Sequence, residues 1–476
     1  MTLLSPNHAI RTLQVCTVLF GLSGCAVGPR YATPEPAAAP NWQESPLSVS
    51  MEPLHWNSYH DWEVPALREL LALAAADNRD LARARADLEE AVARRGLVRS
   101  ALFPQVAAEG SASRQRPSEN TALAQSLPPG TPAGVQNSYA AGLNASWELD
   151  LFGFNRRQVE GADARLEATA AQLDAVRLSI AAEVALAYIE WAALAEALAL
   201  AEERRTLQAE TYALVRTRVE TGLADPLADR TARRDLRLAE AELPTLRAAS
   251  AAARYRLAVL TGQSPEAFNA RFTPPESLPA DSPEQLPASL PAGVVRARPD
   301  VQAAERHLAA AYADLGVAEA DFYPRLRITG GVGWESAGSG DLFDATSRTW
   351  LIRPAVHLPL LQGGRLRAQR GSAEARLEAA RARYEQSILI ALADVETVLA
   401  THLGARQSAT ALAEAADDAR AAEAQAAHLY EVGLADLETL LTARRLRSQT
   451  DTLRLQARTE IHAQAIRYER AIARQP

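Results

Sequence analysis

The sequence predicts an α+β membrane protein in which an internal two-fold repeat carries four β-strands and several very long helices. Three observations lead to this prediction: phrases that recur at a constant offset, four short segments of alternating apolar residues, and two uninterrupted helical runs with seven-residue periodicity. The 476-residue chain is 48% hydrophobic but only 5% aromatic. Such a composition favours long helices rich in Ala and Leu over mixed globular cores.

The repeat is visible in two pairs of phrases. "ETGLADPLADRTARRDL" begins at Glu220 and "EVGLADLETLLTARRLR" at Glu431, an offset of 431 − 220 = 211 residues. Upstream, "DLARARADLEEAVARRGLVRSALFP" from Asp80 matches "DVQAAERHLAAAYADLGVAEADFYP" from Asp300, an offset of 300 − 80 = 220 residues. One module has therefore been duplicated, with changes in loop length between the copies. The copies are expected at residues 63–262 and 297–476, joined by a Pro-rich equatorial linker at 263–296.

Each copy contains two segments of about ten residues in which apolar and polar residues alternate, the length that a tilted strand needs to cross a bilayer. The strands are expected at residues 104–116, 138–152, 324–337 and 350–361. Trp147, Trp334 and Trp350 fall toward strand ends, as an interfacial aromatic belt requires. Hairpins outside the membrane are the alternative that these segments alone leave open.

Four strands cannot close a barrel, and lipid tolerates no open sheet edge. Strands from other subunits must therefore complete the wall. Bacterial single-chain barrels begin at about eight strands, so the strand count leaves both a dimer and a trimer open.

The longest helices are expected at residues 155–221 and 364–432, with return helices at 226–262 and 436–474. Apolar residues such as Leu166, Leu173 and Ile180 recur at seven-residue intervals, which indicates coiled-coil packing. A helix of about 67 residues, at 1.5 Å for each, is roughly 100 Å long.

Two short turns join the long helices to the return helices. Gly222 and Gly433 are predicted to end the long helices, and Asp225 and Asp436 to cap the return helices. A repeated turn at the end of a helical hairpin is a candidate docking surface for a partner protein, and a well-capped turn without a partner is the alternative. The predicted docking residues of these two tips are Gly222, Leu223, Gly433 and Leu434.

Residues 1–24 predict a lipoprotein signal peptide. The apolar stretch "LQVCTVLFGL" ends in "LSGC", which resembles a lipobox, and Cys25 would then become the lipidated first residue of the mature chain. Cys16 would leave with the signal, so no disulfide within the chain and no Cys-based metal site is expected. By resemblance to sorted lipoproteins, Ala26 favours transfer to the outer membrane, with residues 25–62 as a lipidated extended segment. An ordinary secretory signal is the alternative.

Charge and motifs exclude several function classes. A net charge of −8 gives no reason to expect a nucleic-acid partner. The sequence contains no His pair with metal-ligand spacing, no G-x-S-x-G elbow and no phosphate-binding loop. An enzyme is therefore not expected, and no catalytic residue, cofactor or metal site is predicted. No uninterrupted apolar run of about 18 residues follows the N-terminus, which argues against a helical membrane span.

A longer motif resembles a known family. "RARPDVQAAERHLAAAYADLGVAEADFYPRLRITGGVG" from Arg296, with "CAVGPRYATPEP", "WELDLFG" and "LPLLQGGRLRAQ", resembles the outer-membrane factor family, in particular the lipoprotein branch of TolC-like efflux proteins that includes OprM and NodT. The resemblance covers nearly the whole chain in the right order. It implies a homotrimer with a twelve-stranded outer-membrane β-barrel continuous with a long α-helical periplasmic barrel.

The resemblance also implies a function. Such proteins are passive exit ducts of tripartite efflux pumps, anchored in the outer membrane. An inner-membrane transporter of the RND type and a periplasmic adaptor deliver drugs, metal ions or other small solutes to the duct. No motif in this chain identifies the cargo or the particular adaptor.

The family's closed periplasmic aperture is held by ionic and hydrogen-bond contacts near the tips. Members often carry two Asp residues three apart after the second tip, where this chain has Thr439 and Thr442. This departure leaves the gate residues and any cation preference open. Three subunits would arrange any inward-facing carboxylate as a ring that filters cations, whereas a solvated helix surface is the alternative for each. The candidate aperture carboxylates are Asp225, Asp229, Asp436 and Glu438.

Two other functions fit part of the sequence. A lipid-anchored coiled-coil spacer of the periplasm explains the long helices and Cys25, but not the four alternating segments joined to those helices. A diffusion porin explains the strands, but it has no need of long helical segments.

Overall fold

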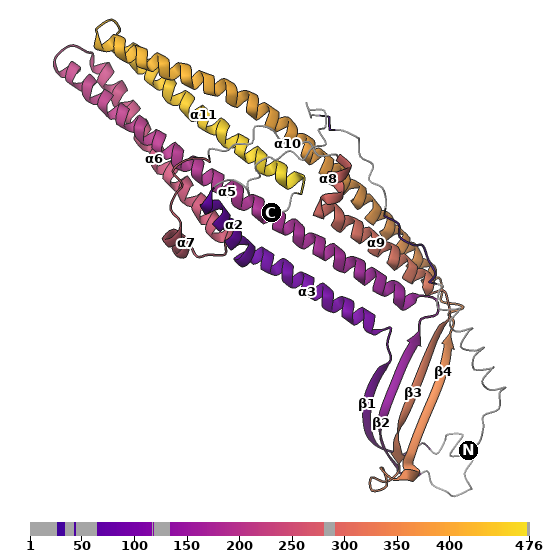
Figure 1. Ribbon diagram of the computed structural model, residues 1–476. Coiled ribbons are helices and arrows are strands. Elements are labelled where there is room, and N and C mark those ends of the chain that lie inside the picture. Colours follow the sequence, from indigo (N-terminus) through magenta and orange to yellow (C-terminus); the bar gives the residue numbers. More distant parts are fainter. Residues whose placement is uncertain are drawn as a thin grey trace. The chain divides into compact units, whose positions relative to one another are not determined.

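The computed structural model describes residues 26–33, 42–43, 64–116, 118, 134–279 and 291–473 (Figure 1). The predicted signal peptide and Cys25 lie outside the described residues, as do parts of the predicted N-terminal segment and linker. The chain divides into two compact units. One contains residues 1–33, 89–169 and 304–384, and the other contains residues 34–88, 170–303 and 385–476. Each unit takes residues from both sequence copies, so the units cut across the repeat.

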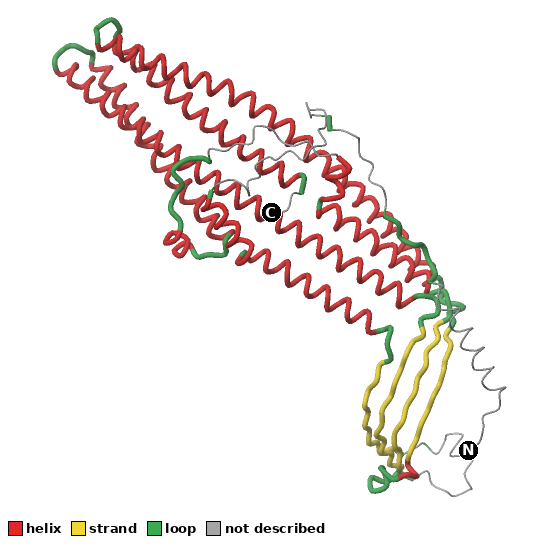
Figure 2. Tube along the Cα trace, in the orientation of Figure 1, coloured by secondary structure: helices red, strands yellow, loops and turns green. Residues whose placement is uncertain are grey.

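The first unit contains a four-stranded antiparallel sheet in the order β1-β2-β3-β4 (Figure 2). The first copy supplies β1 (Gln105–Gln115) and β2 (Gln136–Leu149), and the second copy supplies β3 (Arg325–Ser336) and β4 (Arg348–His357). The pairing of β2 with β3 thus joins the two copies. In this sheet β1 and β4 are the edge strands.

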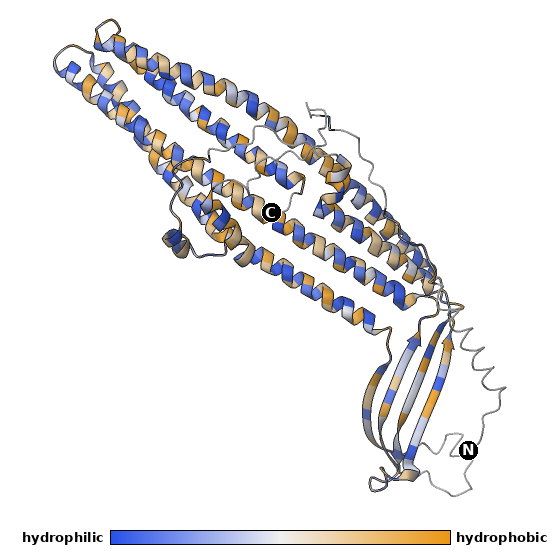
Figure 3. Ribbon diagram, viewed as in Figure 1, coloured by the Kyte–Doolittle hydropathy of each residue, from blue (hydrophilic) through white to orange (hydrophobic). Residues whose placement is uncertain are grey.

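The register of the strands gathers the apolar residues on one face of the sheet. Val332 on β3 pairs with Leu143 on β2 and with Trp350 on β4. All three side chains are about half exposed or more, as expected for residues that contact lipid in the assembled barrel. The alternation of apolar and polar positions along the strands can be followed in Figure 3. The polar positions between them form the opposite face.

Strand β4 is shorter than the sequence predicts. The alternating pattern predicted a strand to residue 361, but β4 ends at His357. Pro359 follows two residues later, and a proline cannot donate the backbone N–H that would extend the ladder. Leu360 and Leu361 beyond it are almost fully exposed.

Two long helical hairpins follow the strands. In the first, α5 (Phe154–Glu220) leads to α6 (Pro226–Leu260), and in the second, α10 (Arg365–Glu431) leads to α11 (Leu437–Ala471). Helices α5 and α10 have 67 residues each, so each is roughly 100 Å long. The shorter helices are α2 (Pro65–Asp77), α3 (Arg79–Ser100), α7 (Pro265–Arg271), α8 (Pro291–Ala297), α9 (Pro299–Ala320) and the 3₁₀ turn η2 (Ala345–Ser347).

The predicted linker contains regular structure. Helix α7 lies within residues 263–296, and α8 begins there and ends at Ala297. Each begins with a proline, Pro265 and Pro291, at a position where the missing N–H has no helical partner to lose. The prolines of this stretch therefore start helices as well as interrupting them.

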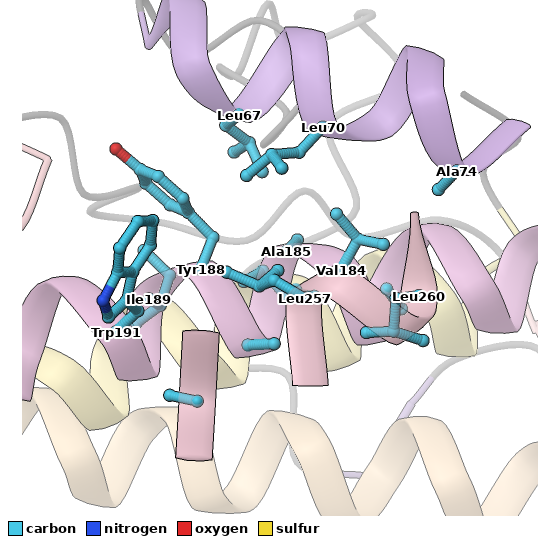
Figure 4. Packing of buried hydrophobic residues seen from close by; sticks show 14 of the residues in the cluster. Leu67, Leu70, Ala74, Val184, Ala185, Tyr188, Ile189, Trp191, Leu257 and Leu260 are labelled. Carbon is cyan, nitrogen blue, oxygen red and sulfur yellow. The ribbon is translucent and has the colours of Figure 1, made fainter. Parts of the chain in front are cut away.

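The largest hydrophobic core lies in the second unit, where α2, α5 and α6 meet (Figure 4). Leu67 and Leu70 of α2 are completely buried against α5 and α6 residues, among them Trp191 and Leu257. Small residues fill the contacts between the helices, and they include Ala182, Ala185, Ala187 and Ala192 of α5. These short side chains let the backbones approach closely. Of the predicted seven-residue positions, Leu173 and Ile180 are buried in this core, whereas Leu166 is only half-buried.

Two histidines are buried among the helices of the second unit. His402 on α10 and His462 on α11 are 3% and 2% exposed. Burial, and secondarily Arg406 beside His402 and Arg458 beside His462, lowers the pKa of each imidazole to about 4, although a hydrogen bond with Pro279 opposes the shift at His462. An unfolded histidine has a pKa of about 6.5. The folded protein therefore holds both rings neutral.

We expect this pair to make the protein sensitive to acid. Between pH 6.5 and 4 the unfolded chain binds more protons than the folded chain, so stability falls as the pH falls through that window. Lowering the pH from 7 to 5 should lower the free energy of unfolding by about 2 kcal/mol for each histidine. His402→Leu should reduce the drop in melting temperature over this range, as measured by thermal unfolding of the purified protein.

His428→Leu on the same helix is the matched control, because His428 is exposed. If the His402 and His428 variants show the same acid sensitivity as the parent protein, the buried ring does not titrate as expected.

Candidate functional site

The two predicted tips adopt the same backbone conformation. Gly222 and Gly433 have φ angles of +75° and +76°, the left-handed conformation that glycine adopts without strain. After each glycine, a leucine N–H turns back to the long helix: Leu223 donates to the Arg218 carbonyl at 2.7 Å, and Leu434 donates to the Leu429 carbonyl at 2.8 Å. This is the usual way to end a helix at glycine. It leaves the two leucines 71% and 77% exposed.

Two of the four candidate aperture carboxylates cap helices. Asp225 accepts a hydrogen bond from the Leu227 N–H at 2.7 Å, and Asp436 accepts one from the Thr439 N–H at 2.8 Å. Hydrogen bonds from the side chain and backbone of Thr439 hold the pKa of Asp436 below its usual range. Both residues are exposed, and each satisfies a backbone donor in the first turn of a return helix.

The other candidate aperture residues lie in the first two turns of the return helices. Asp229 on α6 forms an ion pair with Arg233 at 3.1 Å, one helical turn away. Glu438 and Thr439 on α11 are exposed, and Thr442 is half-buried. The structure therefore brings Asp436 and Thr439 together, while Asp225 and Asp229 belong to the other hairpin.

A hydrogen bond joins the two hairpins near their tips. The Arg218 guanidinium on α5 donates to the Tyr430 hydroxyl on α10 at 3.4 Å. These residues occupy the last turns of the two long helices, just before the glycines. The two tips therefore lie side by side in the second unit.

A stronger connection between the hairpins centres on Arg447, which no sequence pattern predicted. This α11 side chain contacts Glu203 on α5 at 2.9 Å, Glu423 on α10 at 3.3 Å and Asp451 on its own helix at 3.5 Å. Burial opposes the charge on the guanidinium, but the three carboxylates outweigh burial and raise the pKa of Arg447. A second ion pair, between Arg458 and Glu196 at 2.8 Å, also joins α11 to α5.

A cavity of about 300 Å³ lies beside Arg447, between α5 and α11. Its lining includes apolar residues such as Leu207 on α5 and Leu441 on α11, together with Arg447 itself. Beside this cavity the two hairpins are joined by ion pairs, whereas farther from the tips Leu455 and Ile466 of α11 pack into the hydrophobic core with α5 and α6. The ion-paired contact beside the cavity can be broken with little loss of dispersion energy.

The segment that follows Cys25 is held at the start of α5. The buried Arg157 side chain donates to the carbonyls of Val27 and Gly28, both at 3.1 Å, and pairs with Glu160 at 2.7 Å. Gly28 has a φ of +94°, and a Cβ there would lie only 2.7 Å from the Gly316 Cα. The first residues of the predicted mature chain are thus fixed beside the end of β2 in the first unit.

Within the part of the chain that the structure describes, no group of three or more His, Cys, Asp or Glu side chains is placed to hold a metal ion. Helices α5 and α10 each contain a window apolar enough to cross a membrane by length and composition. Less than half of each window is buried in this chain. These windows contain no unbroken run of large apolar residues, because alanines contribute much of their apolar character, and the sequence pattern therefore did not predict them.

Comparison with known proteins now identifies the chain. Residues 70–263 and 293–474 match the model of a family described as outer membrane efflux protein. The chain belongs to this family. It is 32% identical to the probable efflux pump outer membrane protein TtgC of Pseudomonas putida, over 82% of this chain and 80% of TtgC. It is also 32% identical to the outer membrane protein OprJ of Pseudomonas aeruginosa, over 89% of this chain and 87% of OprJ.

A solved structure of the outer-membrane channel OprN has the same fold, with a TM-score of 0.85 and 31% identity. The match covers 95% of this chain and all of the OprN chain. The fold class predicted from the sequence is therefore confirmed: four strands from each chain of a trimer form one barrel, continuous with long helices. This outer membrane efflux protein is an exit duct of the outer membrane, with its helical barrel in the periplasm. The spacer and porin alternatives are wrong.

The role of Asp225 as a helix cap can be separated from any role of its charge. Asp225→Ala should remove the hydrogen bond to Leu227 and destabilise the start of α6 by about 1 kcal/mol. Asp225→Asn should keep most of this stability, because the amide oxygen can accept the same bond. Limited proteolysis at the tip would measure the difference.

The ionic conductance of the Asn variant supplies the second readout. A change in its cation preference would show that the Asp225 charge acts in the aperture as well as in the cap. Equal proteolysis of the Ala variant and the parent protein would contradict the capping role.

Proposed function

We propose that this duct is the outermost part of a tripartite pump and catalyses no reaction itself. It would take drugs, metal ions or other small solutes from an inner-membrane transporter of the RND type through a periplasmic adaptor. The observation that carries this proposal is the pair of matching tips, each of which presents an exposed leucine on a rigid, capped turn. The similarity to TtgC, an outer membrane protein of efflux pumps in Pseudomonas putida, supports the same role.

The adaptor would dock on Gly222, Leu223, Gly433 and Leu434. Exposed leucines gain free energy when a partner covers them, about 25 cal/mol for each Å² of apolar surface. Glycine at the neighbouring position keeps the turn narrow. A trimer presents six such tips, two from each chain, which suits an adaptor that also surrounds the end of the duct as a ring.

We infer that Arg447 holds the periplasmic aperture closed. Its ion pair with Glu203 joins the two hairpins of one chain, while Glu423 and Asp451 hold the same guanidinium on its own hairpin. The cavity beside it leaves room for the hairpins to separate. Without the guanidinium, Glu203 and Glu423 would lose a shared partner and repel each other. The entrance beyond Arg447 would be lined by the candidate aperture residues of the tips, which are Asp225, Asp229, Asp436, Glu438, Thr439 and Thr442.

We also propose that Cys25 carries the acyl chains of a lipoprotein. The contacts of Arg157 with Val27 and Gly28 support this proposal, because they hold the residues next to Cys25 where the helices meet the barrel strands. Acyl chains attached at Cys25 would therefore reach the inner leaflet of the outer membrane without an intervening polypeptide linker.

Loss of the ion-pair centre should open the duct. Arg447→Gln is expected to raise the single-channel conductance or open probability in planar bilayers several-fold, since pairs of this exposure contribute roughly 0.2–1 kcal/mol each and the trimer contains three copies. The same variant should admit large antibiotics to cells that carry it.

Arg445→Gln is the matched control, because Arg445 is exposed on the same helix and forms no ion pair within the described residues. Equal conductance of the two variants would show that Arg447 is not part of the closed gate.

Charge at the tips should prevent docking without preventing assembly. Leu434→Glu is expected to lower the efflux of a drug exported by this pump at least several-fold, because the carboxylate cannot enter an apolar contact. Drug susceptibility of cells measures the effect, and size-exclusion chromatography checks that the trimer still forms.

Leu238→Glu provides the comparison, because Leu238 is 64% exposed on α6 but lies away from the tip. The docking proposal fails if the Leu434 variant exports the drug as well as the parent protein does.

A further inference from the structure

The polar face of the sheet lines the duct, because the apolar face must contact lipid in a membrane barrel. Its residues alternate with the lipid-facing ones along each strand, so the strand register arranges them in rows across the sheet. One of these rows contains Gln105 on β1, Ser146 on β2, Thr329 on β3 and Arg353 on β4. Arg353 is the one charged member of this row.

Arg353 has no acidic partner within the described residues of the chain. The row on one side of it contains Glu148, Arg327 and Ala355. Glu148 there is shared by two other arginines, Arg327 at 3.6 Å and Arg325 at 3.9 Å. Arg327 is the diagonal neighbour of Arg353 across β3 and β4, close enough for the two long side chains to interact. Both guanidinium groups add positive potential to this part of the sheet. The row on the other side, from Ala107 to Leu351, has no charge.

The nearest acid on the opposite side of Arg353 is also engaged. Glu109 lies in the row of Thr349, four residues from Arg353 along β4, which is about 13 Å at 3.3 Å for each residue. It accepts a hydrogen bond from Asn144 at 2.7 Å. Glu109 also lies three strands away from Arg353 within the sheet, so the separation exceeds the Debye length of about 10 Å at 0.1 M salt, and Glu109 of the same chain does not neutralise Arg353.

We propose that the three Arg353 side chains of the trimer form a positively charged ring in the barrel, and that this ring makes the duct favour anionic solutes at that level. The ring forms because every copy of β4 places the same guanidinium at the same height of the wall. Its field acts across the lumen at low salt, where the Debye length reaches about 30 Å. Arg353 is thus a specificity-determining residue for transport that acts independently of the aperture at the tips.

A local chemical measurement tests the ring without interference from the closed aperture. Leu351 lies two residues from Arg353 on the same face of β4, so Leu351→Cys places a thiol beside the ring. The purified trimer is treated with two methanethiosulfonate reagents of similar size, one carrying a sulfonate and the other a trimethylammonium group. Mass spectrometry gives the two labelling rates, and the parent protein without the new cysteine gives the background.

The expected result is a labelling ratio that favours the anionic reagent. At about 10 mM salt, Arg353→Gln in the Leu351→Cys protein should lower the ratio of anionic to cationic rates about fivefold, as a local potential near one kT acts oppositely on the two reagents. Arg353→Lys should keep the ratio, since the charge remains. At about 1 M salt, where the Debye length is about 3 Å, the difference should disappear.

Arg348→Gln is the matched control, because Arg348 is on the same strand but pairs with Trp334 on the apolar face. The proposal is overturned if Arg353→Gln leaves the ratio unchanged or if Arg348→Gln changes it equally. It is also overturned if neither reagent reaches the thiol in a trimer that is intact by size-exclusion chromatography, because Leu351 would then not face the water-filled lumen.

Discussion

A β-strand in hydrocarbon must satisfy its backbone N–H and C=O groups within the protein, and the rest of this structure depends on that constraint. The described sheet leaves β1 and β4 as edges, so a single chain would expose two rows of unpaired polar groups to lipid. Trimerisation removes these edges, because β4 of one subunit can pair with β1 of the next. The lumen is a consequence of this closure, and so is the threefold repetition of each residue that lines it.

The helices follow a different physical rule. Close packing of alanine-rich surfaces, as at Ala185 and Ala192, keeps the α5 backbone near its neighbours along the core of the second unit. Toward the tips this packing gives way to the cavity beside Arg447 and to ion pairs. Ion pairs of moderate exposure are weaker than a packed core. The helices are therefore held firmly where the core lies and less firmly where the proposed aperture has to move.

Local patterns in the sequence were sufficient for most of the fold. Alternating apolar residues and the phrase around Gly222 and Gly433 predicted strands and turns because both depend on neighbouring residues only. The end of β4 was misplaced because the apolar run continues past Pro359. Arg447 could not be identified, because its partner Glu203 lies 244 residues away and no local pattern specifies such a pair. The docking and aperture roles of the tip residues stay predictions.

The pairing of β2 with β3 has a consequence for the order of events during biogenesis. Leu143 and Val332 face each other across this seam, although 332 − 143 = 189 residues separate them in the chain. Contacts of such long sequence separation form late and slowly. The β1–β2 hairpin therefore keeps an unpaired edge at β2 until β3 and β4 have been made. An unpaired strand edge is a template for pairing with another chain, so a delay in forming the seam between β2 and β3 favours aggregation over assembly of the trimer.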